Sequence, residues 1–447
     1  MSQPHVVIIG NGISGVTTAR HIRKNSDQEI SIISAETDYF FSRTALMYIY
    51  MGHMTFKNTQ PYEPQFWVKN RINLKKGRVT NIDYESKILI FDSGEKMSYD
   101  KLVLAVGSKP NKFGWPGQDL KGVQGLYSYQ DLESLEKATE RGIKRGVIVG
   151  GGLIGIELAE MLHSRGIEST FLVREKSFWS NVLPPQESEL INRHIYKNHI
   201  DLRLGEELDE IIAGDDGWVS KIKTKSGEII DCEFVGLTAG VGPNVDFLKG
   251  GDLAIDRGIV VNKHLETNQP DVYAVGDCAQ FSDPVAGRRP MEQVWYTGRI
   301  MGETVAQTIC GNRVEYNPGH WFNSAKFFDV EYQTYGWVFA ELREGEADFY
   351  WEHEDGEKCM HFVFDKESRK LLGVNTFGVR LRHHSFNKWL DEEQTIEHVL
   401  EHLKDANFDP EFYAKQEDKV VAKFNQENGT RITPKKKSWK RILKHIQ

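Results

Sequence analysis

The sequence predicts an α/β fold, with two similar parallel-sheet domains followed by a C-terminal α+β domain. Apolar, strand-like runs alternate with helix-like stretches, which is typical of parallel sheets. One pattern, a strand followed by a glycine-rich turn and a helix, occurs at Gly10 and again 140 residues later, at Gly150. Beyond His320 the sequence changes to aromatic clusters and alternating strands, which indicates a third domain.

The elements of the first domain follow in order from the N-terminus. A buried strand at residues 5–10 leads into a helix at 13–24, and further strands are expected at 30–33, 71–77, 79–93 and 101–106. The stretch at 39–67 is aromatic and rich in turn-forming residues. No simple strand–helix unit is expected there.

The second domain repeats this order. A strand is expected at 146–149, a helix at 154–164, and strands at 169–173, 222–230 and 234–238. In the third domain, strands at 349–351 and 360–364 precede helices at about 395–404. The predicted boundaries are residues 1–112 and 236–318 for a discontinuous first domain, 113–235 for the second, 319–430 for the third and 431–447 for a basic tail.

Composition excludes several classes of protein. The formal net charge of -8 argues against general nucleic-acid binding, because phosphate binding needs a basic face. No run approaches the roughly 18 apolar residues of a membrane-spanning helix. The N-terminus lacks the basic and apolar regions of a signal peptide. A cytoplasmic protein is therefore expected.

The four cysteines are Cys232, Cys278, Cys310 and Cys359. They lie far apart, with no CxxC or other ligand spacing, so neither a metal site nor a disulfide framework is expected. The first 231 residues contain no cysteine.

The first glycine-rich turn has the spacing GxGxxG over residues 10–15. Its first glycine permits a tight turn, the second lets the backbone approach a pyrophosphate, and the third lets the helix pack on the strand. The helix N-terminus then presents N–H groups and a partial positive charge to the phosphates. Glu36, after the second strand, is the expected partner of ribose hydroxyls, and a surface acid is the alternative. The residues expected at this dinucleotide are Gly10, Gly12, Ile13, Ser14, Gly15 and Glu36.

A second part of the same site lies far downstream. A predicted buried strand at 272–275 ends at Gly276 and Asp277, from which a helix is expected to begin. Asp277 can accept a hydrogen bond from a ribityl hydroxyl, and a simple helix N-cap is the alternative. This pattern resembles the second FAD signature of the two-dinucleotide-binding flavoprotein superfamily. The resemblance implies that the first site holds FAD.

The second glycine-rich turn repeats the spacing GxGxxG over residues 150–155. Two such motifs in one chain are hard to explain by packing alone, so a second Rossmann-like site for a nicotinamide dinucleotide is expected. Glu157 is expected near the nicotinamide, as the equivalent glutamate is in the family. The residues expected to bind NAD(P) are Gly150, Gly152, Leu153, Ile154, Gly155, Glu157, Arg174, Glu175 and Gly240.

The choice between NADH and NADPH depends on the end of the strand at 169–173. An acid there favours NAD, and an arginine favours NADP. The usual acid position falls on Val173, whereas Arg174 falls where glutathione-reductase-like proteins place a phosphate-binding arginine. Glu175, an acid, favours NADH instead. NADPH is therefore favoured over NADH.

These residues together resemble the pyridine-nucleotide-dependent FAD oxidoreductases over roughly residues 5–330. That family includes disulfide reductases, NADH oxidases, ferredoxin and rubredoxin reductases and apoptosis-inducing factor. Its disulfide reductases carry a cysteine after the first ribose acid, where this chain has Ser42 to Tyr48 without one. A dithiol relay or a cysteine sulfenate at that place is therefore excluded. Arg43 matches the arginine of the R-P-P-L-S-K stretch of the ferredoxin-reductase branch, and Tyr48 replaces its lysine.

The resemblance implies further residues of the flavin site. Arg43 is a candidate for the FAD phosphates or the flavin edge, with a surface arginine as the alternative. Trp295 fits a core position equally well. Additional FAD contacts are expected from Arg43, Val79, Ala105, Gly107, Gln293 and Val294. The candidates nearest the flavin or nicotinamide are Glu157, Trp295 and Tyr48.

The expected reaction is the transfer of electrons from NAD(P)H through FAD to an acceptor, with the chemistry supplied by the cofactors. The expected acceptor is a small acidic redox protein of ferredoxin or rubredoxin type. The tail at 431–447 has seven Lys or Arg and no acid, so it would attract such a partner. The alternatives are a membrane-associated NADH:quinone dehydrogenase, an NAD(P)H oxidase and a non-enzymatic flavoprotein scaffold. The C-terminal domain resembles the interface domain of the family, which forms dimers in some members.

Overall fold

The structure is a computed structural model that describes residues 3–409 and 414–435. Its internal contacts divide the chain into two units. The first unit comprises Met1–Gly150, Met161–Thr170 and Glu207–Pro318, and the second comprises Gly151–Glu160, Phe171–Glu206 and Gly319–Gln447. The predicted domain boundaries stay a prediction.

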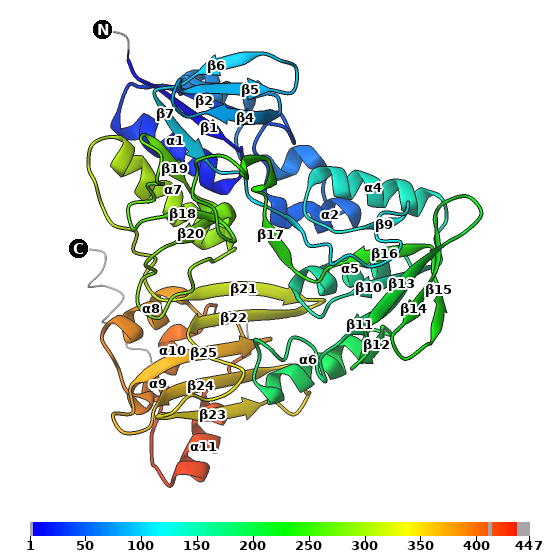
Figure 1. Cartoon of the computed structure of the whole chain (residues 1–447). Helices are drawn as coiled ribbons and strands as arrows, with labels where there is room; N and C mark the ends of the chain where they lie inside the picture. Colours follow the sequence, from blue (N-terminus) through cyan, green and yellow to red (C-terminus); the bar gives the residue numbers. More distant parts are fainter. Residues whose placement is uncertain (1–2, 410–413, 436–447) are drawn as a thin grey trace. The chain divides into compact units, whose positions relative to one another are not determined.

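The first unit is built on a five-stranded parallel sheet in the order β19-β7-β1-β2-β3 (Figure 1). β1 pairs in parallel with both β2 and β7, so that Ile9 lies between Ile33 and Leu104. β1 and β7 are apolar and buried after their first residue, as is typical of inner strands of a parallel sheet. Its strands are β1 (His5–Ile9), β2 (Glu29–Ser34), β3 (Ile72–Lys76), β7 (Lys101–Leu104) and β19 (Val272–Ala274).

Helices α1 (Ile13–Asn25) and α7 (Trp295–Ile309) pack directly against each other. A Cβ added at Gly302 would lie 2.6 Å from the backbone oxygen of Ser14, and one at Gly298 would lie 2.7 Å from the Ser14 hydroxyl. The two glycines therefore allow α7 to approach the first turn of α1. This contact fixes the end of α1 that carries the first glycine-rich turn.

The rest of the first unit adds smaller sheets and short helices. β10 and β9 each pair in parallel with β16, and two antiparallel meanders, β4-β5-β6 and β13-β14-β15, complete the larger strand groups. The segment Tyr127–Tyr129 lies at the start of α4. The elements are β4 (Val79–Asp83), β5 (Ile88–Phe91), β6 (Lys96–Ser98), β8 (Ser108–Pro110), β9 (Val123–Gln124), β10 (Arg145–Val149), β13 (Leu208–Ala213), β14 (Val219–Thr224), β15 (Ile229–Asp231), β16 (Phe234–Leu237), β17 (Val241–Pro243), β18 (Ile259–Val261), β20 (Ala279–Phe281), α2 (Leu46–Tyr50), α3 (Pro64–Lys69) and α4 (Tyr129–Glu140).

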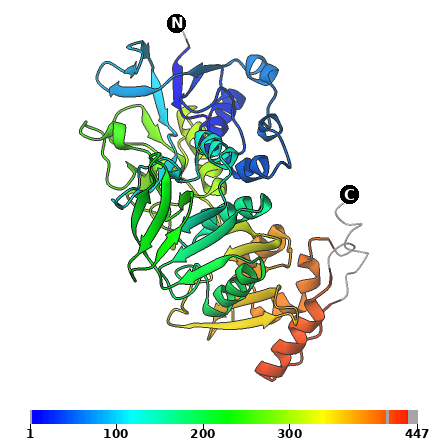
Figure 2. The same ribbon diagram turned by 90° about the vertical axis from the view of Figure 1, so that its right-hand side faces the viewer.

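The second unit contains a five-stranded antiparallel sheet in the order β21-β22-β25-β24-β23. Its core joins buried side chains of this sheet, such as Phe362 and Val374, to Phe386, Val399 and Phe424 of the following helices. Figure 2 shows the backbone of the sheet in yellow and of the helices in orange and red. The elements are β21 (Phe322–Phe327), β22 (Val330–Gly336), β23 (Glu346–Glu352), β24 (Cys359–Asp365), β25 (Leu371–Phe377), α6 (Pro185–Lys197), β12 (Asp201–Leu204), α8 (His383–Asp391), α9 (Ile396–Glu401), α10 (Leu403–Ala406) and α11 (Glu417–Asn428). α5 (Leu153–Ser164) and β11 (Glu168–Val173) follow β10 along the chain.

Helix α6 is held to this sheet by a buried ionic cluster. His361 on β24 contacts Glu187 of α6 at 2.9 Å and Asp348 of β23 at 2.8 Å. Asn375 donates to the second carboxylate oxygen of Glu187. Burial opposes a charge on His361, but Asp348 and Glu187 outweigh it and raise its pKa to about 9. The imidazole is therefore a cation at neutral pH.

The predicted α/β class is confirmed, with local differences. The helix expected after Asp277 is wrong: Gly276–Cys278 forms a single 3-10 turn, because Ala279–Phe281 continues as β20 and pairs with β18. The irregular stretch at 39–67 contains the short helices α2 and α3. No described helix has the length and apolarity needed to cross a membrane. Most of the basic tail, at 436–447, lies outside the described residues.

Candidate functional site

The first glycine-rich turn has three glycines in three different situations. Gly10 has a φ of +116°, and a Cβ there would lie 2.0 Å from the backbone oxygen of Ala105. A Cβ at Gly15 would lie 2.1 Å from the oxygen of Gly10. A Cβ at Gly12 would meet nothing within 4 Å. The chain itself requires the first and third glycines, whereas Gly12 borders open space at the N-terminus of α1.

The second glycine-rich turn repeats this geometry. Gly150 has a φ of +115°, and a Cβ there would lie 2.7 Å from the Cα of Ala239. A Cβ at Gly152 would meet nothing within 4 Å. α5 begins at Leu153, directly after Gly152, and Ile154 is its second residue. Both turns therefore leave a space at the middle glycine, at a helix N-terminus suited to a phosphate group.

Glu36 and Arg43 form an ion pair beside the first turn. Both guanidinium nitrogens of Arg43 donate to the Glu36 carboxylate, at 2.8 and 2.6 Å. The N–H of Tyr129 also donates to Glu36, at 2.8 Å. Burial disfavours the charge of Arg43, but the hydrogen bond to Glu36 outweighs it and raises the pKa of Arg43. Arg43 is thus not a free surface arginine, and Glu36 retains part of its acceptor capacity for a ligand.

Asp277 belongs to a polar group that includes Tyr127, a residue the sequence analysis missed. The hydroxyls of Tyr127 and Ser108 each donate to Asp277 at 3.2 Å, and the side-chain amide of Gln293 donates to Ser108 at 2.7 Å. Arg43 lies over the Tyr127 ring at 4.5 Å. Burial raises the pKa of Asp277, while the hydrogen bonds from Ser108 and Tyr127 oppose the rise.

The remaining candidates of the first unit lie in several places. Gly276 has a φ of +77° and faces the Ser14 hydroxyl, and Gly107 faces the Tyr127 hydroxyl. Val79 is buried in β4, Ala105 packs against Gly10, and Gly240 has a φ of +89° near Asn111. Val294 precedes α7, whose first residue, Trp295, contacts Tyr296 edge to face. Tyr48 of α2 stacks on His53.

Helix α5 carries two acids one turn apart, Glu157 and Glu160. Burial, and next the negative charge of Glu160, raise the pKa of Glu157 to about 7. Glu160 is buried, and its Oε1 accepts a hydrogen bond from Lys326 of β21 at 2.9 Å. Glu157 can therefore exist in both charge states near neutral pH.

Arg174 and Glu175 follow β11 and contact each other. The Arg174 Nε lies 2.9 Å from the Glu175 carboxylate. The Arg174 side chain is 73% exposed and that of Glu175 is 29% exposed. The arginine is therefore the more accessible of the two side chains.

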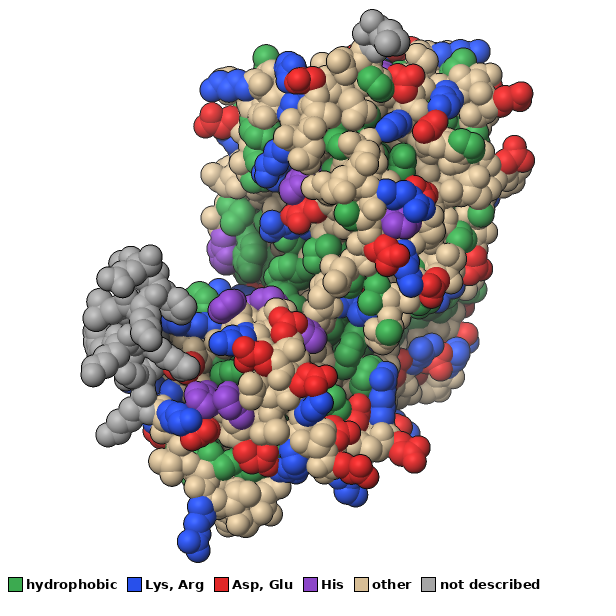
Figure 3. All heavy atoms as spheres, turned by 90° about the vertical axis from the view of Figure 1, so that its left-hand side faces the viewer, with side chains coloured by type: hydrophobic (Ala, Val, Ile, Leu, Met, Phe, Trp, Pro, Cys, Tyr) green, Lys and Arg blue, Asp and Glu red, His purple; other side chains and the backbone are tan. Residues whose placement is uncertain are grey.

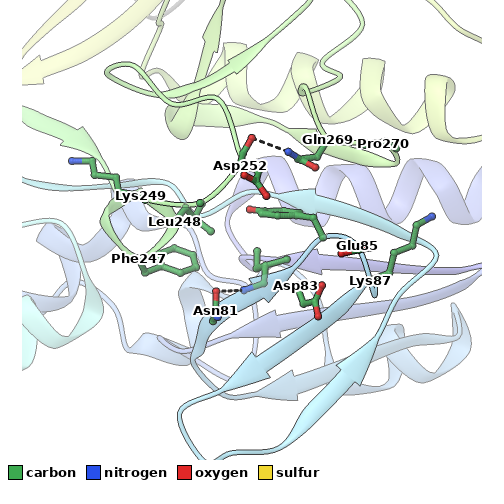
Figure 4. A pocket seen from close by; sticks show the side chains of 14 residues that line it. Asn81, Asp83, Glu85, Lys87, Phe247, Leu248, Lys249, Asp252, Gln269 and Pro270 are labelled. Atoms are coloured by element: carbon green, nitrogen blue, oxygen red, sulfur yellow. Dashed lines mark hydrogen bonds between the residues drawn. The ribbon is translucent and has the colours of Figure 1, made fainter.

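The first unit also contains a separate pocket, with a volume of about 580 Å³. Figure 4 shows the side chains that line it. It lies between the β4–β5 turn, with Asp83 and Lys87, and the segment from Phe247 to Asp252. None of the residues predicted to bind a cofactor lines it. Among the described residues, no group of three or more His, Cys, Asp or Glu could hold a metal ion.

The chain matches known proteins over most of its length. Residues 4–307 match the family model described as pyridine nucleotide-disulphide oxidoreductase. The chain is 30% identical over 326 residues to an NADH oxidase of Methanocaldococcus jannaschii, covering 70% of this chain and 71% of that protein. It is 26% identical over 309 residues to a rubredoxin-NAD(+) reductase of Pseudomonas putida, covering 68% and 80%. Two other relatives are much longer, and the match spans 48% of one and 35% of the other.

The fold also matches solved structures. The ferredoxin reductase for the CYP199A2 system from Rhodopseudomonas palustris superposes with a TM-score of 0.77 at 23% identity, covering 94% of this chain and 100% of that chain. This likeness shows the fold of the chain.

Proposed function

Because the chain belongs to the pyridine nucleotide-disulphide oxidoreductase family, we propose that it is an NAD(P)H-dependent FAD oxidoreductase that passes electrons to a small redox protein. The observation that carries this proposal is the repeated glycine geometry. Gly10 and Gly150 adopt nearly the same φ, and each is followed two residues later by a glycine bordering open space. One such turn fits one dinucleotide, and two fit a prosthetic group and a diffusible donor.

The residues of the first turn fit FAD. The N–H groups at the start of α1 can bind the pyrophosphate, and Glu36, fixed by Arg43, can accept from the ribose hydroxyls. Asp277, oriented by Ser108 and Tyr127, can accept from the ribityl chain. FAD, when bound, supplies a two-electron acceptor that can release its electrons singly.

The second turn fits the nicotinamide nucleotide. The start of α5 can bind the pyrophosphate, and Glu157 is the acid proposed to lie near the nicotinamide. Arg174 supports a preference for NADPH, because an exposed guanidinium can bind the 2′-phosphate by charge-assisted hydrogen bonds. Glu175, in contact with it, supports NADH in the same position.

The absorption spectrum of the purified protein, followed by anaerobic titration with NADH and with NADPH, tests this proposal. A yellow protein whose flavin band is bleached by either nucleotide is the expected result. A colourless protein that FAD does not reconstitute, or a flavin that neither nucleotide reduces, would refute it.

The proposed acceptor is a ferredoxin or rubredoxin type protein. The rubredoxin reductase among the relatives supports this class, and the basic residues of the tail complement acidic carriers. On the face in Figure 3, basic and acidic side chains are interspersed, so the charge argument depends on the tail. Turnover with ferredoxin, rubredoxin and quinone, with and without residues 431–447, separates a protein acceptor from a membrane quinone.

The second candidate function is an NAD(P)H oxidase. The NADH oxidase at 30% identity favours it. Oxygen consumption that matches NAD(P)H oxidation, with no faster turnover on any redox protein, would establish the oxidase. Cytoplasmic location and dimer formation stay predictions, which cell fractionation and light scattering test.

A further inference from the structure

Gln293 lies at the end of a series of hydrogen bonds within the first unit. Its side-chain amide donates to the Ser108 hydroxyl at 2.7 Å, and the Ser108 hydroxyl donates to Oδ2 of Asp277 at 3.2 Å. The Tyr127 hydroxyl donates to the same carboxylate oxygen, also at 3.2 Å. The series therefore runs in one direction, from the amide of Gln293 to the carboxylate of Asp277.

This direction fixes which end of the Gln293 amide faces Ser108. A carboxylate oxygen accepts hydrogen bonds, so Ser108 gives its single hydroxyl proton to Asp277. Ser108 can then only accept from Gln293, and only the NH2 group of an amide can donate. Oε1 of Gln293 is left at the other end of the amide. It accepts no hydrogen bond within residues 3–409 and 414–435, and the side chain is only half-buried.

A buried ion pair holds the main chain that carries Gln293. Arg288 makes two hydrogen bonds of 2.6 Å to the carboxylate of Glu292, the residue before Gln293. The two charged side chains are only 6% and 4% exposed. The Thr297 hydroxyl lies 2.9 Å from the backbone oxygens of Glu292 and Val294. The backbone on both sides of Gln293 is therefore held in place, as its amide is.

We infer that Gln293 recognises the flavin ring by accepting a hydrogen bond at Oε1 from the N3–H group of the ring. The inference rests on the proposed function, in which Gln293 contacts FAD. An amide oxygen in a fixed orientation selects a ligand with a donor, and the oxidised isoalloxazine ring has a single N–H group, at N3. Ser108, Arg288 and Glu292 are positioning residues here, because they act through Gln293.

Binding of FAD and of 3-methyl-FAD, in which a methyl group replaces the N3 hydrogen, tests the inference. In the wild type, the Kd for 3-methyl-FAD should exceed the Kd for FAD by about 5- to 150-fold, because Oε1 loses its donor. Gln293→Met keeps the size of the side chain but has no amide oxygen, so this ratio should fall about tenfold. Ser108→Ala should also lower the ratio, because the amide is then free to turn.

Two outcomes of this measurement overturn the inference. A wild-type ratio near one would show that N3–H is not recognised. Equal ratios in the wild type and in Gln293→Met would show that the methyl group acts through its size alone. A wild type that binds neither flavin overturns the proposed function instead.

The same ratio tests the buried pair. Arg288→Met and Glu292→Gln should each lower it, because each change leaves the other charge buried and unpaired. Arg299 and Glu303 on α7 are the matched control, since this Arg–Glu pair has the same spacing but side chains that are 55% and 34% exposed. Arg299→Met should leave the ratio unchanged. A ratio that neither Arg288→Met nor Glu292→Gln lowers would overturn the positioning role of the pair.

NMR with FAD labelled with ¹⁵N at N3 follows the N3–H group directly. Its proton resonance in the bound flavin should move in Gln293→Met and in Ser108→Ala, and should stay in place in Arg299→Met. A general loss of packing would not select these two variants, because the reporter is the proton that Oε1 is inferred to bind. A resonance at the same position in the wild type and Gln293→Met would overturn the inference.

Discussion

Replacing the middle glycine of each turn should remove one cofactor and leave the fold intact. Gly12 has φ -72° and ψ -177°, a conformation open to any residue, and a Cβ there meets no protein atom within 4 Å. Gly12→Ala should therefore change the free energy of unfolding by no more than about 1 kcal/mol, mainly because alanine is a poorer N-cap. Gly10→Ala is the contrasting change, because its Cβ would overlap the oxygen of Ala105.

The expected loss of affinity follows from the space that the new methyl group occupies. If the pyrophosphate of FAD approaches Gly12, an added methyl group acts like overpacking, which costs about 1–3 kcal/mol. Since about 1.4 kcal/mol is a factor of ten, the Kd for FAD should rise about 5- to 150-fold. Gly152→Ala, whose Cβ also meets nothing within 4 Å, should raise the KM for NAD(P)H by a similar factor and leave FAD binding unchanged.

The assay measures FAD per chain after dialysis, the Kd of FAD for the apoprotein, and the KM of each variant for the nucleotide. Denaturant unfolding of the apoproteins serves as the control for the fold. The reasoning is refuted if Gly12→Ala binds FAD like the wild type. It is equally refuted if both variants lose both cofactors, because the two turns would then not be separate sites.

Three further predictions concern nucleotide preference, packing and pH. Arg174→Ala should lower kcat/KM for NADPH by about 10- to 150-fold and leave kcat/KM for NADH nearly unchanged, because hydrogen bonds to a charged group contribute about 1.5–3 kcal/mol. Steady-state kinetics with both nucleotides check this, and equal losses with NADH and NADPH would contradict it. Gly302→Ala should destabilise the protein by about 1–3 kcal/mol despite the higher helix propensity of alanine, because its Cβ would lie 2.6 Å from the backbone oxygen of Ser14. Thermal unfolding measures this, with Gly251→Ala as the control, because a Cβ at Gly251 would have only a 4.0 Å contact. The pKa of His361 is raised to about 9 in the folded chain, so its stabilising charge is fully present below about pH 6.5 and is lost as pH rises through 9. In the wild type, the free energy of unfolding measured with denaturant should fall by about 3 kcal/mol as the pH rises through this range. An equal fall in His361→Gln would contradict the prediction.

The sequence predicted those features that depend on local spacing. The strand, glycine turn and helix at residues 5–24 occur as expected, because GxGxxG spacing and apolar periodicity are both local signals. The structure separates the roles of the glycines further. Gly10 and Gly15 are needed for contacts within the chain, whereas Gly12 has no such contact. A motif alone does not distinguish these two reasons for a glycine.

The sequence did not predict contacts between residues far apart in the chain. Tyr127 lies in a segment without a motif, yet its hydroxyl contacts Asp277, 150 residues later. Glu187 and His361 are 174 residues apart, so no periodicity relates them. The helix expected after Asp277 failed for a similar reason: the pairing of β20 with β18 competes with helix formation. Such outcomes depend on tertiary pairing, which local propensity does not encode.

The family description includes disulphide chemistry, but a cysteine relay beside the proposed flavin site is opposed on two independent grounds. The sequence has no cysteine before Cys232, so none can stand in the stretch after Glu36 where the disulfide reductases carry theirs. The second ground is the state of the cysteines that do occur. Cys232, Cys278 and Cys359 are buried, and burial raises the pKa of Cys232 and of Cys278 to about 12. Since the thiolate is the reactive form, burial makes these three side chains poor nucleophiles at neutral pH, whereas Cys310 is partly exposed. In the proposed reaction, electrons leave the reduced flavin directly for the acceptor, so alkylation of the partly exposed Cys310, or its replacement by serine, should leave turnover unchanged.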